Sequence, residues 1–205
     1  MANSIIENLG DKEWARKIYE KEIERGDSGE CRRIANDIYG MLGDKEWAKE
    51  VYKKAEEKAE TSYDFLSLAE GLCEKLNDKE WAKKVYKKAE GKAETSDDFC
   101  SLAQILMSDQ LKDKVWAKKV YKKAEGKAEN CYDFINLAAS LFELGDKEWA
   151  KKNYIKAEES AEGSYDLNSL AESICENLGD KKWAKLVEQK AKELEEENDD
   201  EDDDE

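Results

Sequence analysis

The sequence predicts an all-α protein, an α-solenoid of about six helix-turn-helix repeats of about 34 residues each. Two observations carry this prediction. All six Trp of the 205-residue chain lie in one recurring motif, at spacings of 33, 34, 35, 33 and 34 residues. Within each repeat, apolar residues recur at steps of three and four, as they do on one face of a helix.

The second helix of each repeat, here called the B helix, begins with the Trp motif. In the segment 78–94 the apolar side chains share one face, and mostly Lys and Glu fill the positions between them. Asp78 suits the start of this helix, because a carboxylate there accepts backbone hydrogen bonds and faces the positive end of the helix dipole. The motif recurs at 11–15, 44–48, 113–117, 146–150 and 180–184. Each Trp is expected to pack where the two helices of its own hairpin meet.

The first helix of each repeat, here called the A helix, precedes the Trp motif. In the segment 61–77 it has one apolar face, formed by Phe65, Leu68, Ala69, Leu72, Cys73 and Leu76. Thr61 and Asp64 have the spacing of a capping box, and the same device recurs at 95–98 and 130–133. Neither helix is apolar all round, so one hairpin cannot bury both stripes, whereas stacked hairpins can.

The predicted solenoid covers residues 1–192, and its ends differ. The chain begins partway along an A helix, so the first repeat is incomplete, and Ile5, Ile6 and Leu9 are expected to contact a second copy or a partner. The B-helix Tyr of each repeat is expected to pack onto the next hairpin. Glu188 stands at that position in the last repeat, as a terminal repeat with a polar outer face requires.

The hairpins resemble the tetratricopeptide repeat over about residues 2–192. The A-helix pattern of that family is matched by Phe65, Leu68, Ala69 and Leu72, and its B-helix pattern by Ala82, Tyr86 and Ala89, with equivalents in other repeats. The segment 14–20 is also similar to the half-TPR (HAT) variant. Two features depart from the family: the chain has no Pro, which usually ends the B helix there, and its Trp opens the B helix.

The resemblance implies a right-handed superhelix whose A helices line a concave groove. It places a partner-binding set of residues in that groove: Tyr39, Tyr63, Glu70, Cys73, Glu74, Gln104, Met107, Tyr132, Phe142, Glu143, Tyr165, Glu172 and Glu176. One column of this surface is apolar in every repeat, namely Ile6, Tyr39, Cys73, Met107, Phe142 and Cys175. Flanked by carboxylates, such a column suits a peptide or helix that carries basic residues. The alternative is that the column packs between neighbouring A helices.

Composition argues against catalysis and metal binding. The chain has no His, which excludes Ser/His/Asp and Cys/His catalysis and His-based zinc sites. The five Cys form no C-x-x-C pair and fall at most once per repeat, as small apolar residues do. We therefore expect a non-catalytic protein without cofactor or metal. An odd number of Cys, no apolar run long enough for a membrane span and no signal-like N-terminus favour the cytoplasm.

Charge is concentrated at one end of the chain. Segment 193–205 contains eleven acidic residues and no basic one, so residues 1–192 carry only −5 of the formal net charge of −16. A run of like charges repels itself, and this segment is predicted to be a disordered acidic tail. Direct nucleic-acid binding is not expected, because it requires a positive field.

These features predict a protein–protein interaction scaffold that binds a peptide or helix carrying basic residues in its concave groove. Two alternatives stay open. The first alternative is an acidic decoy or chaperone-like protein that engages a basic partner through its tail and acidic surface. The second is a self-assembling structural module.

Overall fold

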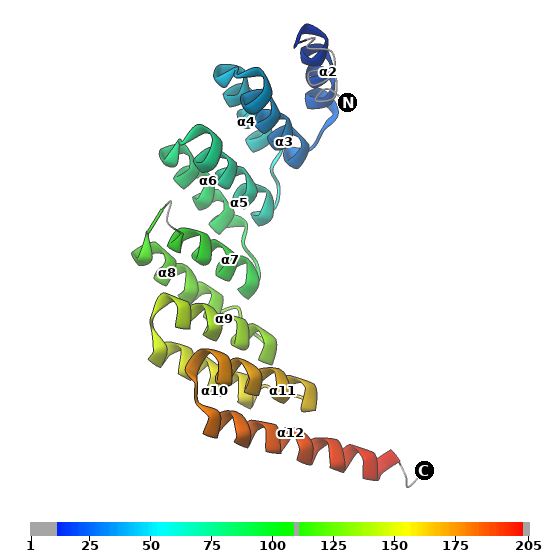
Figure 1. Cartoon of the computed structure of the whole chain (residues 1–205), viewed down its shortest axis with the longest axis vertical. Coiled ribbons are helices and arrows are strands. Elements are labelled where there is room, and N and C mark those ends of the chain that lie inside the picture. Colours follow the sequence, from blue (N-terminus) through cyan, green and yellow to red (C-terminus); the bar gives the residue numbers. More distant parts are fainter. Residues whose placement is uncertain (1–11, 109–110, 203–205) are drawn as a thin grey trace. The chain divides into compact units, whose positions relative to one another are not determined.

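The computed structural model describes residues 12–108 and 111–202, with side chains up to residue 196, and this part of the chain is α-helical without a strand (Figure 1). The prediction of an all-α protein built from adjacent helix pairs is thereby confirmed. The chain divides into two compact units, Met1–Ala93 and Glu94–Glu205.

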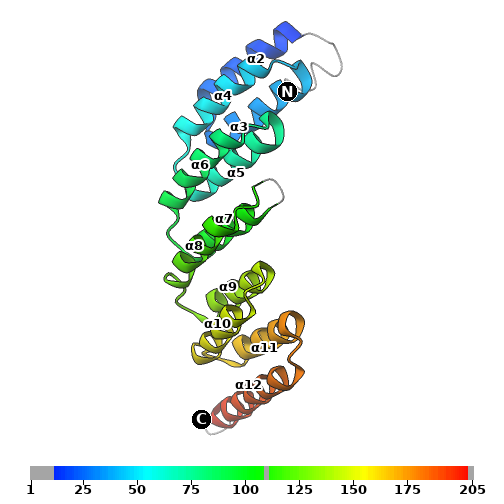
Figure 2. The same ribbon diagram turned by 90° about the vertical axis from the view of Figure 1, so that its left-hand side faces the viewer.

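The first unit consists of a lone B helix and two hairpins. Helix α2 (Lys12–Arg25) is followed by α3 (Ser28–Asp37), which pairs with α4 (Lys45–Lys58), and by α5 (Ser62–Gly71), which pairs with α6 (Lys79–Lys92). Helices α3 and α5 are A helices and contact each other, and α4 and α6 are B helices. Figure 2 shows the two helices of each pair side by side.

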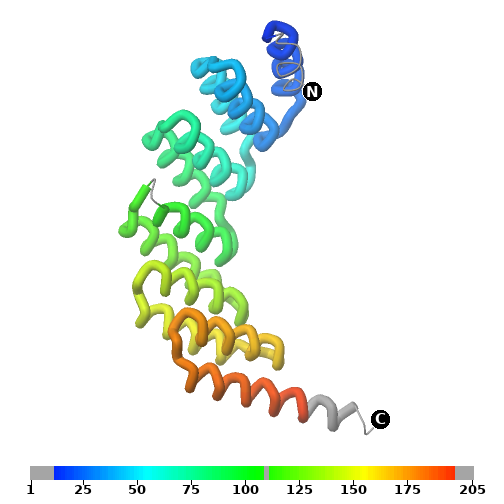
Figure 3. Tube along the Cα trace, viewed as in Figure 1, coloured from blue at the N-terminus to red at the C-terminus, as the bar shows by residue number. Residues whose placement is uncertain are grey.

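The second unit contains three hairpins. Its A helices are α7 (Ser96–Met107), α9 (Cys131–Leu144) and α11 (Ser164–Ser173), and its B helices are α8 (Lys114–Glu125), α10 (Lys147–Glu159) and α12 (Lys181–Asp202). Each A helix pairs with the B helix that follows it, and α9 contacts both α7 and α11. The trace in Figure 3 shows the short turns that join the helices of a pair.

An Asp caps the start of the B helices, as the sequence predicts. In each, a carboxylate oxygen accepts a hydrogen bond from the backbone N–H of the Trp three residues later, at 3.0 to 3.3 Å. The five capping residues are Asp44, Asp78, Asp113, Asp146 and Asp180. This bond satisfies one of the N–H groups that a helix start leaves without an intrahelical partner.

Two of the three predicted capping boxes form in full, at 61–64 and 95–98. At 130–133 the Asn130 Oδ1 accepts from the N–H of Asp133, but the Asp133 carboxylate accepts from the N–H of Glu129. The Thr61 hydroxyl accepts from the N–H of Asp64 at 3.1 Å, and the Asp64 carboxylate accepts from the N–H of Thr61 at 3.0 Å. Thr95 and Asp98 repeat the arrangement at the start of α7. These boxes form the turns from B to A helices, at the place where the tetratricopeptide repeat usually has Pro.

From Trp47 onward, the one-residue differences in Trp spacing arise in the A-to-B turns. Leu72 precedes Trp81 by nine residues, and the A helix ends there in a π-helical turn, η2 (Leu72–Leu76). The same turn occurs as η1 (Ile38–Leu42) and η3 (Ile174–Leu178). Leu141 precedes Trp149 by eight residues, and α9 stays α-helical. The π turn therefore accommodates one extra residue without disturbing the next B helix.

The core of each hairpin follows the predicted pattern of small and large residues. The A-helix Leu68 and Ala69 and the B-helix Ala82 and Ala89 are fully buried, as are their equivalents in the other hairpins. Small side chains let the paired helices approach closely. Within a unit, the B-helix Tyr contacts the next hairpin, as expected: Tyr52 contacts Gly71, and Tyr154 contacts Ser173. A Cβ at Gly71 in α5 would lie 3.2 Å from the Tyr52 ring of α4, so a side chain there would require the ring to shift by a few tenths of an ångström.

The Trp side chains make contacts that the sequence prediction does not include. Within each unit, Trp47, Trp81, Trp149 and Trp183 contact the preceding B helix. Trp81 meets Tyr52 edge to face, with ring centroids 6.5 Å apart, and its Nε1 donates to Glu56 at 2.7 Å. Trp81 lies in the first turn of α6, on the side that faces α4, and its indole N–H therefore reaches an acceptor on that helix.

The last helix extends into the segment for which the sequence predicts disorder. Helix α12 continues to Asp202, and Leu194 packs against the core cluster of the second unit. Glu188, the polar residue expected at the Tyr position, is exposed. Ile5, Ile6 and Leu9 lie outside the described residues.

Candidate functional site

The predicted partner-binding residues lie on the A helices and on the π turns that continue them, and most are exposed. Three Tyr at the starts of A helices are the most accessible: Tyr63 is 74% exposed, Tyr132 66% and Tyr165 81%. An exposed Tyr offers a large, rigid apolar face and a hydroxyl group, and Tyr is enriched where proteins meet.

The acidic members of the set are also exposed, and the A helices of the second unit contain no basic residue, although Lys147 of α10 lies with its Nζ 5.4 Å from the centre of the Phe142 ring. Helices α7, α9 and α11 contain Asp and Glu but neither Lys nor Arg. Glu143 lies near the end of α9, Glu172 in α11 and Glu176 in η3, and all three are exposed. The A helices of this unit therefore present an acidic surface with two prominent Tyr.

In the first unit, two carboxylates of the set share their surroundings with an arginine. Desolvation raises the pKa of Glu70 and the nearby Glu74 raises it further, whereas Arg32 of α3 acts in the opposite direction. The Arg32 Nε is buried without a hydrogen-bond partner in the described structure. Crowded carboxylates of this kind gain stability from an added cation.

The apolar column does not form one uniform surface. Tyr39, Met107 and Phe142 are half-buried, and Cys175 is exposed. Cys73 is 6% exposed, so its side chain belongs to the core of its hairpin instead of a binding surface. A thiol is small enough to be covered by the surrounding helices. Ile6 lies outside the described residues.

Gln104 has a structural contact in addition to its exposed position. Its Nε2 donates to the Ser140 Oγ at 3.0 Å, and Ser140 in turn donates to the carbonyl of Asn136. This chain of hydrogen bonds joins α7 to α9. Gln104 therefore helps to fix the spacing of the two A helices that carry the acidic surface.

The sequence analysis did not single out three exposed aliphatic residues on the B helices of the second unit. Val115 is 71% exposed, and Ile155 and Leu186 are also exposed. Each replaces a charged or polar residue found at the same position of the other repeats. Comparing the repeats position by position would have revealed them, because exposed positions elsewhere in the B helices carry mostly Lys and Glu.

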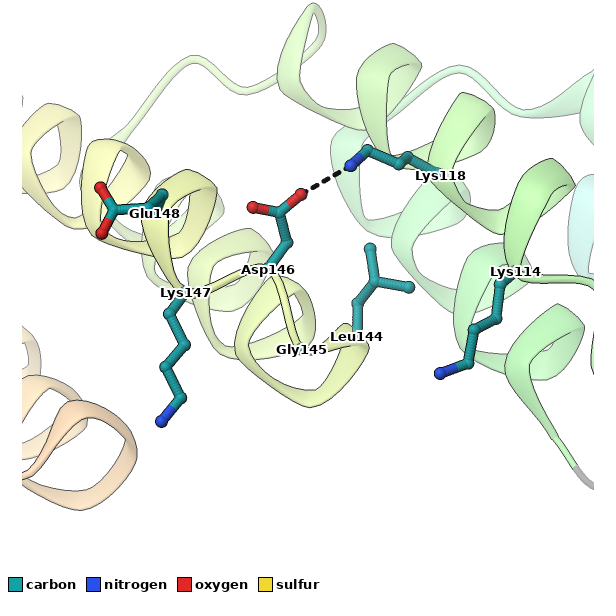
Figure 4. Close-up of a pocket in the computed structure, with 7 residues that line it drawn as sticks. All are labelled: Lys114, Lys118, Leu144, Gly145, Asp146, Lys147 and Glu148. Atoms are coloured by element: carbon teal, nitrogen blue, oxygen red, sulfur yellow. Dashed lines mark hydrogen bonds and ion pairs between the residues drawn. The ribbon is translucent and has the colours of Figure 1, made fainter.

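The described surface hollows are lined by other residues than the predicted set. One lies at the turn between α9 and α10, next to the start of α8 (Figure 4). There the Lys118 Nζ lies 2.7 Å from an Asp146 carboxylate oxygen, and the Lys147 side chain points away from that pair. Hydrogen bonding to Lys118 is the main reason that the pKa of Asp146 is lowered.

Four of the five thiols, those of Cys31, Cys73, Cys100 and Cys131, are buried, and Cys175 is exposed. Burial raises the pKa of Cys100 to about 12 and that of Cys131 to about 11, so both thiols stay protonated at neutral pH. Among the described residues, no cluster of His, Cys, Asp or Glu is suited to hold a metal ion. In the same part of the chain, no helix combines the length and the apolar character needed to cross a membrane.

Comparison with known proteins adds no family to this description. No protein-family model matches the chain, and no curated protein matches it significantly.

Proposed function

We propose that the chain is a non-catalytic cytoplasmic scaffold, a right-handed α-solenoid of the tetratricopeptide-repeat kind that binds a basic peptide or helix on its A helices. One observation carries this proposal: in the second unit the A helices carry exposed Tyr and carboxylates and no basic side chain. Such a surface complements Lys and Arg and offers aromatic faces to apolar side chains or cations.

The binding residues proposed for the second unit are Tyr132, Tyr165, Glu143, Glu172 and Glu176. They come from α9, α11 and η3, which contact one another. Tyr132 and Tyr165 would supply most of the binding energy, because buried aromatic anchors dominate interfaces. The carboxylates would select basic partners and speed their association.

A peptide-display selection on the full-length protein tests this proposal. Selected peptides should be enriched in Lys or Arg beside apolar residues. The change of Glu172→Lys with Glu176→Lys should weaken the best peptide about tenfold or more, since like charges then face each other. Fluorescence anisotropy of the labelled peptide measures the affinity.

The matched control places the same charge change on B helices of the same unit. Glu159 and Glu188 are exposed on α10 and α12, and Glu159→Lys with Glu188→Lys should leave affinity within about twofold. Equal losses in both double variants would reduce the effect to net charge. Selected peptides without basic residues would contradict the proposal.

The acidic segment 193–205 supports a second candidate, the acidic decoy, because it carries eleven of the acidic residues and no basic one. Replacing its Asp and Glu by Asn and Gln separates the two candidates. Peptide binding that survives this replacement but not the A-helix changes supports the scaffold, whereas the opposite result supports the decoy.

A further inference from the structure

One B helix of the second unit presents an unusually basic surface. On α8 the exposed side chains of Lys114, Lys118, Lys119 and Lys122 surround Val115, and we call these five residues the α8 lysine face. Lys118 forms an ion pair with Asp146, whereas no ion pair of Lys114, Lys119 or Lys122 occurs among the described residues.

The start of α8 also lacks a charge that other B helices have. Helices α4, α6 and α10 carry Glu46, Glu80 and Glu148 in the first turn, and α8 has Val115 at that position. A cation at a helix start is unfavourable because the helix dipole is positive there. An anionic group placed on this face would remove that repulsion and complement the three lysines.

The same chain contains a segment of matching chemistry. Residues 193–205 hold eleven acidic residues and no basic one. We propose that this acidic segment binds the α8 lysine face of a second copy of the chain. The occupant follows from charge complementarity between the acidic segment and the α8 lysine face, three of whose four Lys form no ion pair among the described residues.

The contact is expected between two molecules because of the path of α12. This helix is continuous from Lys181 to Asp202, which corresponds to about 30 Å of helix. Figure 1 shows α12 running away from the start of α8, so this helix does not turn back toward α8 of the same molecule.

Sedimentation velocity of the full chain over a range of concentrations tests this proposal. We expect concentration-dependent self-association at 50 mM salt that weakens about tenfold or more at 500 mM salt, because exposed charges are screened. The triple change Lys114→Glu, Lys119→Glu and Lys122→Glu should abolish it. Replacing the seven acidic residues of 199–205 by Asn and Gln should do the same.

The matched control makes an equal charge change on the B helices of the first unit. Lys53, Lys84 and Lys87 are exposed there, and changing all three to Glu should leave self-association intact. A loss equal to that of the α8 changes would overturn the assignment to α8. Association that resists salt, as expected of an apolar contact, would also overturn it, as would a monomer at every concentration.

Mixing the two inactive variants provides a further test. The α8 variant keeps its acidic segment, and the tail variant keeps its lysine face. The mixture should therefore form a heterodimer through one remaining contact, although neither variant associates alone. Failure of the mixture to associate would contradict a direct contact between the two segments.

Discussion

At the scale of single residues, Asn153 is the clearest departure from the repeat. It is fully buried in α10, at a position where other B helices bury Val51, Val85, Val120 and Val187. Its Nδ2 donates to the carbonyl of Trp149 at 3.0 Å, but its Oδ1 has no partner in the described structure. A buried polar atom without a hydrogen bond costs free energy, so this residue weakens its hairpin.

We therefore expect Asn153→Val to raise the free energy of unfolding by about 1–2 kcal/mol, because an apolar side chain of similar size removes the unpaired group. Urea unfolding followed by circular dichroism measures the change. The reverse substitution in α8, Val120→Asn, should lower stability by a similar amount. A loss of stability in Asn153→Val would show that the amide contributes a favourable contact.

At the scale of helices, a repeated set of contacts joins neighbouring B helices within each unit. Glu158 of α10 accepts a hydrogen bond from Trp183 Nε1 of α12 at 2.9 Å and pairs with Lys190. Glu56 and Glu125 hold the equivalent Trp and Lys of their neighbours in the same way. One carboxylate thus fixes both the position and the register of the next B helix.

Removing the Glu158 carboxylate should lower stability, whereas removing that of the adjacent Glu159 should not. Glu158→Ala should lower the free energy of unfolding by about 1–2 kcal/mol, since Trp183 Nε1 and Lys190 both lose their acceptor. Glu158→Gln should cost less, because the amide oxygen still accepts from the indole. The adjacent, exposed Glu159→Ala should change stability by less than about 0.5 kcal/mol. Equal losses at both positions would show that the contact contributes nothing specific.

Sequence periodicity predicts the helices and their caps, but not how their ends and neighbours are arranged. The Thr61–Asp64 box and the Asp78 cap follow from local spacing, because both partners lie within three residues. The π turns and the orientation of Trp81 depend on contacts between helices, which local patterns do not contain. The family resemblance predicts Tyr132 and Tyr165 as binding residues. The exposed Val115, Ile155 and Leu186 emerge only when the repeats are compared position by position.

At the scale of the whole molecule, acidic and basic side chains are most clearly separated in the second unit. In the second unit the A helices lack basic residues, and α8 carries five Lys and one Glu. The formal net charge of −16 conceals this separation, because most of it belongs to residues 193–205. The two proposals use the two kinds of charged surface. In the scaffold, a basic partner binds the acidic A helices. In the self-association, an acidic segment binds the basic α8.

The stability of the whole molecule should also depend on pH through its capping carboxylates. Burial favours protonation of Asp64 and Asp98, but hydrogen bonds from backbone N–H groups and from Thr hydroxyls outweigh it and lower both pKa values. A group whose pKa is lowered by folding stabilises the folded state when it is ionised. This stabilisation is present above the usual Asp pKa of about 4 and is lost as the pH falls through the lower folded value.

We expect thermal unfolding temperatures to be nearly constant from pH 6 to 8 and to fall below about pH 4. The change of Asp64→Ala with Asp98→Ala should remove about 1 kcal/mol per cap at pH 7 and flatten the acid limb of the curve. The exposed neighbour Asp97→Ala serves as the control and should keep that limb. Glu70 acts in the opposite sense, because its raised pKa favours the folded state when it is protonated. An acid limb equally steep in the double variant would show that other carboxylates cause the pH dependence.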